Sequence, residues 1–172
     1  MNANELGHGL EAYSVTVLIF EDRYLLLERA ATKAFAPLRW TGVGGHVEAD
    51  EFDNLRGSSL RELEEEAGFA ESDIANFALR RALLVAPVEG PLKIVVYCTA
   101  RLHVWSLPAC PEGTLRWVAR EEIDVLDVIE DTAQVLPLLF DDEVRDPQGH
   151  EPIRIGIGRH RTDGRCAPLL WQ

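Results

Sequence analysis

Glutamate is concentrated in one short stretch of the chain, where Glu62 and Glu64–Glu66 fill four of five consecutive positions. On a helix, Glu62, Glu65 and Glu66 stand at i, i+3 and i+4, so their carboxylates share one face, while Glu64 points elsewhere. Like charges at this spacing cost about 0.2–0.5 kcal/mol per pair. Either the stretch is the solvated face of an acidic protein, or a cation offsets the repulsion.

A glycine-rich turn, GVGG from Gly42 to Gly45, precedes these acids. Hard divalent cations take oxygen ligands, and Mg²⁺ commonly combines one or a few carboxylates with water and substrate phosphates. Glycine lets backbone carbonyls and amides approach one point closely. We therefore expect a cation between the turn and the acidic face, where it would also attract a phosphate to a protein that otherwise repels it.

The composition limits the classes of function. The chain has 172 residues, 47% of them hydrophobic, and a net charge of −12. This predicts a single domain over residues 1–172. The acidity argues against nonspecific binding to long nucleic acid. There is no apolar run near the roughly 20 residues of a membrane helix and no signal-peptide pattern at the N-terminus, so we expect a cytoplasmic protein.

Three cysteines, Cys98, Cys110 and Cys166, are widely spaced. An odd count without a CxxC pair predicts neither a disulfide framework nor a zinc ribbon. We expect them to be reduced and packed against neighbouring side chains.

The elements that position the acids are expected from residue periodicity. The predicted strands are Tyr13–Phe20 and Tyr24–Ala30 as a hairpin, Ala78–Val88, Leu92–Trp105, Leu115–Ala119, and a final hairpin over 151–171 that turns near Thr162–Gly164. The predicted helices are Asn54–Ala67, closed by Gly68, a turn over Glu121–Leu126, and Glu130–Asp142, in which Pro137 marks a kink or a late first turn. Interspersed helices and strands predict a mixed α/β fold, a mixed sheet covered by helices.

At the glycines and glutamates the sequence resembles the Nudix box of the MutT-type pyrophosphohydrolases. Five residues separate Gly45 from Glu51, and Arg61–Phe69 (RELEEEAGF) matches the second half of the box, with Phe69 replacing an aliphatic residue. Nine residues separate Glu51 from Arg61 where the family usually has seven. Asp53 would restore the spacing but would put Val47 at the glycine position, so we interpret the difference as a two-residue insertion where the helix begins.

The resemblance implies a three-layer α/β/α sandwich with a mixed sheet, and Mg²⁺- or Mn²⁺-dependent hydrolysis of a nucleoside diphosphate linked to another group. It implies metal ligation by Glu62, Glu65, Glu66 and the carbonyl of Gly45, with Arg61 holding the carboxylates. The general base must lie within hydrogen-bonding reach of the attacking water. Glu51, Glu62 and Glu112 are the candidates. Glu112 is equally a further metal ligand or an ordinary loop acid.

Substrate contacts are expected from fewer signals. Arg29 could contact phosphate or form a surface salt bridge, Glu48 could line the phosphate channel or be solvated, and Trp40 could stack on a base or cover the core. Gly44 is expected beside the phosphates. The run RWTGVGGHVE and the late helix resemble the subgroup that hydrolyses oxidised purine nucleoside triphosphates, and Asp131 aligns with its base-reading aspartate. Thr41 and Ile129 depart from that subgroup.

The expected activity is hydrolysis of a nucleoside triphosphate, including one with an oxidised base, to a monophosphate and pyrophosphate, as in nucleotide sanitation. A nucleoside diphosphate sugar or a dinucleotide is the alternative substrate. A non-catalytic nucleotide sensor is the alternative class, although retention of all three glutamates argues against it. The partner is a small nucleotide, and a monomer and a homodimer are both compatible with the sequence.

Overall fold

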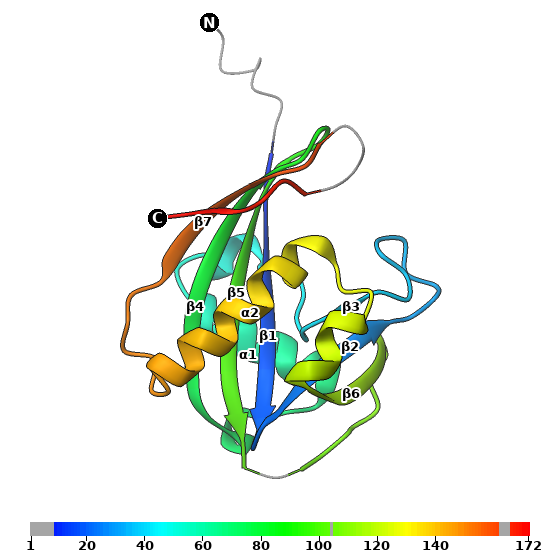
Figure 1. The fold of residues 1–172 in the computed structure, drawn as a ribbon, viewed down its shortest axis with the longest axis vertical. Coiled ribbons are helices and arrows are strands. Elements are labelled where there is room, and N and C mark those ends of the chain that lie inside the picture. Colours follow the sequence, from blue (N-terminus) through cyan, green and yellow to red (C-terminus); the bar gives the residue numbers. More distant parts are fainter. Residues whose placement is uncertain (1–8, 104, 162–165) are drawn as a thin grey trace, which may run out of the picture.

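The computed structural model describes residues 9–103, 105–161 and 166–172, and these residues form a mixed sheet with helices on both sides (Figure 1). The strands are β1 (Leu10–Phe20), β2 (Arg23–Arg29), β3 (Trp40–Thr41), β4 (Ile74–Ala86), β5 (Leu92–Leu102), β6 (Gly113–Ala119), β7 (Arg154–Arg159) and β8 (Leu170–Trp171). The helices are α1 (Leu55–Ala67) and α2 (Glu130–Arg145), with 3₁₀ turns η1 (Ala49–Glu51), η2 (Glu71–Asp73) and η3 (Arg120–Val125).

The strand order is β3-β2-β1-β5-β4-β7-β8, and β6 also pairs with β2. The pairs β1–β5 and β4–β7 are parallel, whereas the other ladders between named strands of the described chain are antiparallel. This confirms the mixed sheet and the hairpin of β1 with β2.

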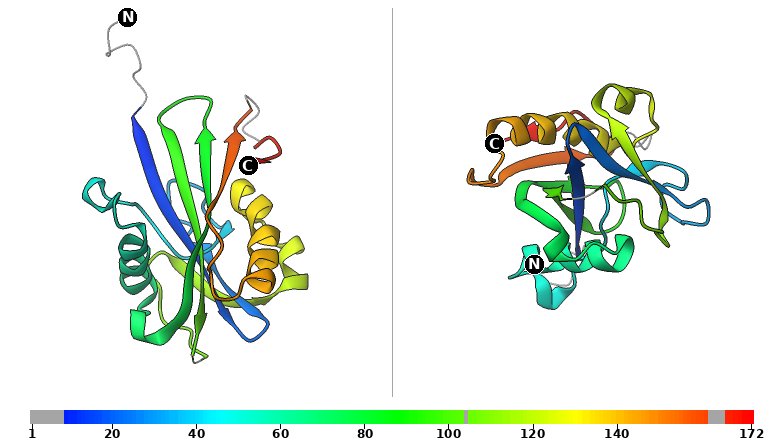
Figure 2. Two further views of the ribbon diagram at one scale, coloured as in Figure 1. Left: turned by 90° about the vertical axis from the view of Figure 1, so that its left-hand side faces the viewer. Right: turned by 90° about the horizontal axis from the view of Figure 1, so that it is seen from below.

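The two long helices cover opposite faces of the sheet, as Figure 2 shows in its left view. Leu63 and Ala67 of α1 pack into one buried cluster with Leu18 and Leu25. A second buried cluster combines α2 residues such as Leu136 and Leu139 with the other sheet face. Because each helix buries one apolar stripe against the sheet, the expected three-layer arrangement is confirmed.

Helix α1 is capped at both ends, and its C-terminal cap is the glycine that the sequence predicts. The side chain of Asn54 accepts a hydrogen bond from the Gly57 amide at 3.0 Å. Gly68 adopts a left-handed conformation with φ of 66°, and its amide bonds to the carbonyl of Glu64. Local caps of this kind fix where the glutamate-bearing turn ends.

Some predicted boundaries shift. Strand β4 begins at Ile74 rather than Ala78 and ends at Ala86 rather than Val88, because Pro87 has no amide to donate to a ladder. Helix α2 runs on to Arg145 and continues through Pro137. The antiparallel pair of β7 and β8 confirms the final hairpin, although the turn predicted near residues 162–164 lies outside the described residues.

Strand β1 exchanges partners along one edge. It pairs with β2 over its last three residues, Leu18–Phe20. Along the earlier part of that edge, the Ser14 amide donates to the Gly45 carbonyl at 2.9 Å and the Thr16 amide donates to the Val43 carbonyl at 2.7 Å. This change of partner leaves the glycine turn bonded to β1 and next to α1.

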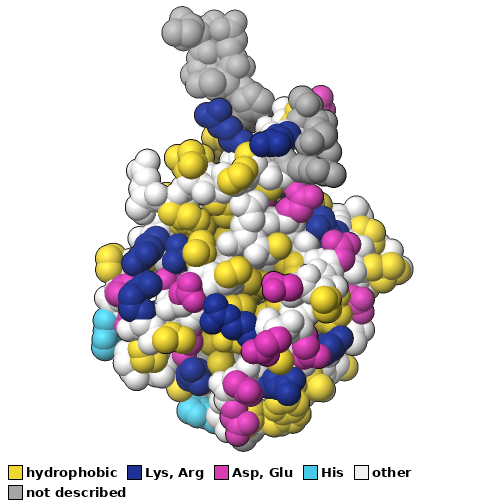
Figure 3. All heavy atoms as spheres, viewed as in Figure 1, with side chains coloured by type: hydrophobic (Ala, Val, Ile, Leu, Met, Phe, Trp, Pro, Cys, Tyr) yellow, Lys and Arg dark blue, Asp and Glu magenta, His cyan; other side chains and the backbone are white. Residues whose placement is uncertain are grey.

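The surface mixes charges of both signs. On the face that carries α2, acidic and basic side chains alternate without a large patch of either sign (Figure 3). None of the described helices combines the length and the apolar character needed to cross a membrane.

Candidate active site

Arg61 is the hub of the acidic face of α1. Its Nη1 donates to Glu62 Oε1 at 2.8 Å and to Glu65 Oε2 at 3.0 Å. Its Nη2 also donates to the His46 carbonyl at 3.1 Å, which ties the helix to the chain just beyond the glycine turn. One guanidinium therefore offsets part of the repulsion among the glutamates and fixes their orientation.

Glu51 is the fourth carboxylate in this arrangement. Arg61 Nε and Nη2 contact its two oxygens at 2.7 Å each. This two-point contact with Arg61 lowers the pKa of Glu51 to about 2, with help from the Glu48 amide. Glu51 is the last residue of η1, and it pairs with Arg61 across the short segment that leads into α1.

Glu66 has a different environment from its neighbours. Its Oε2 is one of four buried side-chain oxygens in the described chain that lack a hydrogen-bond partner. Burial, followed by the nearby Glu112 carboxylate, raises the pKa of Glu66 to about 7. Glu112 itself pairs with Lys33. A buried carboxylate oxygen without a donor is costly unless a cation or water completes it.

The glycine turn is closed to larger residues. A Cβ on Gly45 would lie 2.2 Å from Glu62 Oε2, and one on Gly44 would lie 2.0 Å from the Ser14 carbonyl oxygen. Glu62 therefore leaves no room for a side chain at Gly45. Glu62 is itself buried, and this burial raises its pKa.

These features fit a hard divalent cation. Glu62 Oε2 faces Gly45, Glu66 Oε2 lacks a partner, and Glu65 is more than half exposed with one oxygen not engaged by Arg61. All are oxygen donors, the type that Mg²⁺ and Mn²⁺ prefer. The Gly45 carbonyl accepts the Ser14 amide, which leaves one of its two lone pairs for a further contact.

A cavity of about 450 Å³ opens beside these acids. Glu66, Glu112 and Gly44 line one part of it, and Arg29 and Asp131 line others. Arg29 Nε also donates to the Phe35 carbonyl at 3.0 Å, which holds the guanidinium at the wall. The cavity thus joins the acidic cluster to space of the size that small-molecule sites occupy.

Two residues considered as substrate contacts lie elsewhere. Trp40 is 8% exposed and packs in the core beneath α2 rather than in the cavity wall, so its position supports core packing and not stacking on a base. Glu48 is exposed at the start of η1, where its amide donates to Glu51 Oε2, and it does not line the cavity.

Several cavity residues were not expected from the sequence. Lys93 of β5 lines the wall, and its Nζ lies 5.6 Å from the centre of the Phe35 ring and 5.8 Å from that of Tyr13. His160, which follows β7, also lines the cavity and contacts Asp131. Neither residue sits in a local motif, because the sheet brings it to the cavity from a distant part of the chain.

The comparisons with known proteins agree with this geometry. The family model described as the NUDIX domain matches residues 10–146. A search of the curated proteins finds no match.

Among solved structures, the chain is similar to a mutator MutT protein from Bacillus halodurans, with 17% identity, a TM-score of 0.70, and 94% of this chain and 97% of that chain covered. It is similar to the MutT protein from Methanosarcina mazei Go1, with 19% identity, a TM-score of 0.63 and coverage of 82% and 99%. It is also similar to the NUDIX domain of Shewanella oneidensis NrtR complexed with ADP ribose, with 13% identity, a TM-score of 0.59 and coverage of 82% and 92%. At these identities the solved structures support the fold, while the family model covers most of the sequence. The chain belongs to the Nudix family of hydrolases.

Proposed function

We propose that the protein hydrolyses a phosphoanhydride bond in a nucleoside diphosphate linked to another group, with Mg²⁺ or Mn²⁺ as the cofactor. The observation that carries the proposal is the unpartnered, buried Oε2 of Glu66, which lies among the carboxylates of α1 at the wall of the cavity. A bound divalent ion would supply charge neutralisation at phosphate oxygens and polarise the phosphorus–oxygen bonds.

The chain's own residues divide the remaining work. Glu62, Glu65, Glu66 and the Gly45 carbonyl would hold the ion, and Arg61 would keep the carboxylates in register. Both oxygens of Glu51 accept from Arg61, and its pKa of about 2 is far below that of an effective base at neutral pH. We therefore assign Glu51 a positioning role, which leaves Glu62 and Glu112 as candidates for the general base.

The wall of the cavity supports a nucleotide substrate. Arg29 and Lys93 place two cations in the wall of the same cavity, where they can bind phosphate oxygens. We propose a nucleoside triphosphate, including one with an oxidised base, as the substrate. Water attacks a phosphorus atom, the bond between two phosphates breaks, and a monophosphate and pyrophosphate leave, in keeping with a role in nucleotide sanitation.

The sheet continues beyond residues 10–146, the part that the family model matches. Strand β7 pairs with β4 over Arg154–Arg159, and β8 pairs with β7. We infer that the C-terminal hairpin belongs to the same domain as the carboxylates, because it continues the same sheet and brings His160 to the cavity wall.

A substrate screen with a matched pair of variants tests the proposal. Nucleoside triphosphates, their oxidised forms, nucleoside diphosphate sugars, ADP ribose and dinucleotides are assayed with Mg²⁺ and with Mn²⁺. Glu66→Gln should lower metal-dependent turnover by at least about 100-fold, the upper end of what a lost outer-shell partner costs a metal site. Glu64→Gln, on the exposed side of the same helix, should retain wild-type turnover.

The reaction in ¹⁸O-labelled water identifies the phosphorus that is attacked. If a sugar nucleotide or a dinucleotide gives the highest turnover, the proposed substrate is wrong, but the proposed hydrolysis of a phosphoanhydride bond still holds. If no compound is turned over but a nucleotide raises the melting temperature, the protein is a nucleotide sensor and not an enzyme.

A further inference from the structure

Three side chains of different chemistry meet at the cavity, and two of them line its wall. They are Asp131 in the first turn of α2, His160 after β7, and Cys166 in the segment before β8. One ligand atom from each lies within 4.8 Å of the other two, and all three residues are half-buried. His160 Nε2 is 3.3 Å from both oxygens of Asp131.

The backbone holds the three residues together. His160 and Cys166 face each other across an antiparallel bridge, so their side chains leave the backbone side by side. The Cys166 amide donates to Glu130 Oε2 at 2.6 Å, and Gln134 accepts from the Leu169 amide at 3.1 Å. The segment that carries Cys166 is therefore anchored on the helix that carries Asp131.

The electrostatics of the cluster favour an added cation. When ionised, the Cys166 sulfur and the Asp131 carboxylate would repel each other across this short distance. A cation beside the sulfur would turn this repulsion into attraction and would stabilise the thiolate. His160 Nε2 contacts the Asp131 carboxylate, and a neutral imidazole can ligate a metal at this position.

We propose that Asp131, His160 and Cys166 form a second metal site, selective for a zinc-like ion rather than for Mg²⁺. Thiolate, imidazole and carboxylate are the ligand types that Zn²⁺ takes in proteins, whereas Mg²⁺ takes oxygen alone. Tetrahedral zinc, with bonds of about 2.0–2.3 Å, separates its ligand atoms by roughly 3.3–3.8 Å. The ligand atoms lie up to 4.8 Å apart, so side chains would have to move by about 1–1.5 Å to reach the spacing around a zinc ion.

The site would have one open coordination position. Three protein ligands leave the fourth position of a tetrahedral ion for water or for a group on a bound molecule. Asp131 and His160 line the cavity, so an ion here would lie in its wall. The ion would also join α2 to the C-terminal hairpin.

Cobalt spectroscopy tests the site directly. Reduced protein is saturated with Mg²⁺ to occupy sites made of oxygen alone, and Co²⁺ is then added as a spectroscopic substitute for Zn²⁺. We expect the near-ultraviolet thiolate-to-cobalt charge-transfer band to saturate at one Co²⁺ per chain and Zn²⁺ to abolish it. Absence of the band in the wild-type protein would overturn the proposal.

Three variants locate the sulfur and separate this site from the α1 carboxylates. Cys166→Ser should lose the band, and its persistence there would overturn the assignment. Cys110→Ser, whose thiol lies near Glu66 and Glu112, should keep the band. Glu66→Gln should also keep it while losing turnover, so that failure of one proposal is distinguishable from failure of the other.

His160→Gln provides a readout that does not depend on the folding of Cys166→Ser. Circular dichroism checks that the variant is folded, and Zn²⁺ affinity is measured by competition. We expect Zn²⁺ affinity to fall by more than the roughly 10–100-fold that follows the loss of a residue hydrogen-bonded to a metal ligand. Wild-type Zn²⁺ affinity in the folded variant would contradict the proposed ligand set.

Discussion

At the scale of single residues, the acidic face of α1 depends on one arginine. Arg61 contacts three carboxylates and a backbone carbonyl, and its side chain is only about one-third exposed. The surrounding carboxylates, Glu51 first, raise the pKa of the guanidinium, so it stays charged over the whole working range of pH. The repulsion that the sequence suggests is thus partly balanced within the protein before any metal binds.

Arg61→Lys tests this role. Lysine keeps the charge but presents a single point in place of a planar fork, so it cannot hold Glu51 at two points and also reach Glu62 and Glu65. We expect kcat/KM at limiting Mg²⁺ to fall by about 10–100-fold while the protein remains folded. Steady-state kinetics across a Mg²⁺ titration measure the effect.

Arg56→Lys is the matched control for that substitution. Arg56 lies on the same helix, is exposed, and pairs with Glu71 outside the acidic cluster. Exposed pairs of this kind contribute about 0–1 kcal/mol, so kinetics and stability should stay close to wild type. Equal kinetics for the two variants would show that the contacts of Arg61 do not position the carboxylates.

At the scale of elements, α1 and the turn before it were predictable because their signals are local. The cap at Asn54, the stripe through Leu63 and Ala67, and the left-handed Gly68 all act within a few residues of one another. The exchange of partners along β1 was not predictable, because it depends on hydrogen bonds between segments about 30 residues apart in the chain. The cavity beside this part of β1 could not be predicted from the sequence for the same reason.

Two glycines of this region separate stability from activity. A Cβ on Gly68 meets no heavy atom within 4 Å, but φ of 66° penalises any other residue. Gly68→Ala should therefore lower the free energy of unfolding by about 1–2 kcal/mol and leave kcat unchanged. Urea denaturation and a turnover assay measure the two quantities.

Gly45→Ala should behave in the opposite way. The added methyl group would displace Glu62 Oε2, so metal-dependent turnover should fall by at least about 10-fold, the lower end for a disturbed metal ligand. If both alanine variants change turnover equally, the two glycines do not have the separate roles described here. In those roles, Gly45 is required because it lies close to Glu62, and Gly68 is required because of its left-handed conformation.

At the scale of the whole molecule, the sequence identified the helix that carries the acids but not what attaches α2 to the sheet. Arg80 and Arg81 lie within the predicted strand Ala78–Val88. In the structure they are 6% and 3% exposed and meet acids near the C-terminal end of α2. Asp131, His160 and Cys166 converge in the same non-local way.

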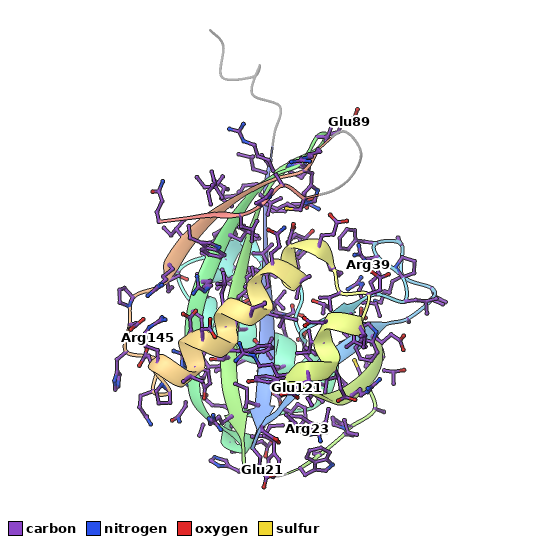
Figure 4. The ribbon with its side chains drawn as sticks, viewed as in Figure 1. Glu21, Arg23, Arg39, Glu89, Glu121 and Arg145 are labelled. Atoms are coloured by element: carbon purple, nitrogen blue, oxygen red, sulfur yellow. The ribbon has the colours of Figure 1, made fainter. Side chains whose placement is uncertain are left out.

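The buried ion pairs clamp α2 against β4. Asp142 accepts hydrogen bonds from Arg81 at 2.6 and 2.8 Å and from Arg145 at 2.6 Å. Arg145 lies at the C-terminal end of α2, where Figure 4 labels it. Glu143 accepts from Arg80 at 3.1 Å and from Arg101 at 2.6 Å. Because α2 also carries Asp131, this clamp holds one wall of the cavity.

Adjacent acids in α2 test the clamp. Asp142→Asn leaves the buried Arg81 without a carboxylate, and loss of one partner from a buried pair costs about 3–5 kcal/mol. Asp141→Asn changes the next residue, which is exposed and paired with Arg120, and should cost less than about 1 kcal/mol. Urea denaturation measures both.

Replacing both buried partners, as in Arg81→Met with Asp142→Leu, should recover much of the loss because the cost of burying the charges disappears as well. Equal stability of the two asparagine variants would show instead that the apolar stripe of α2 holds the helix on the sheet by itself.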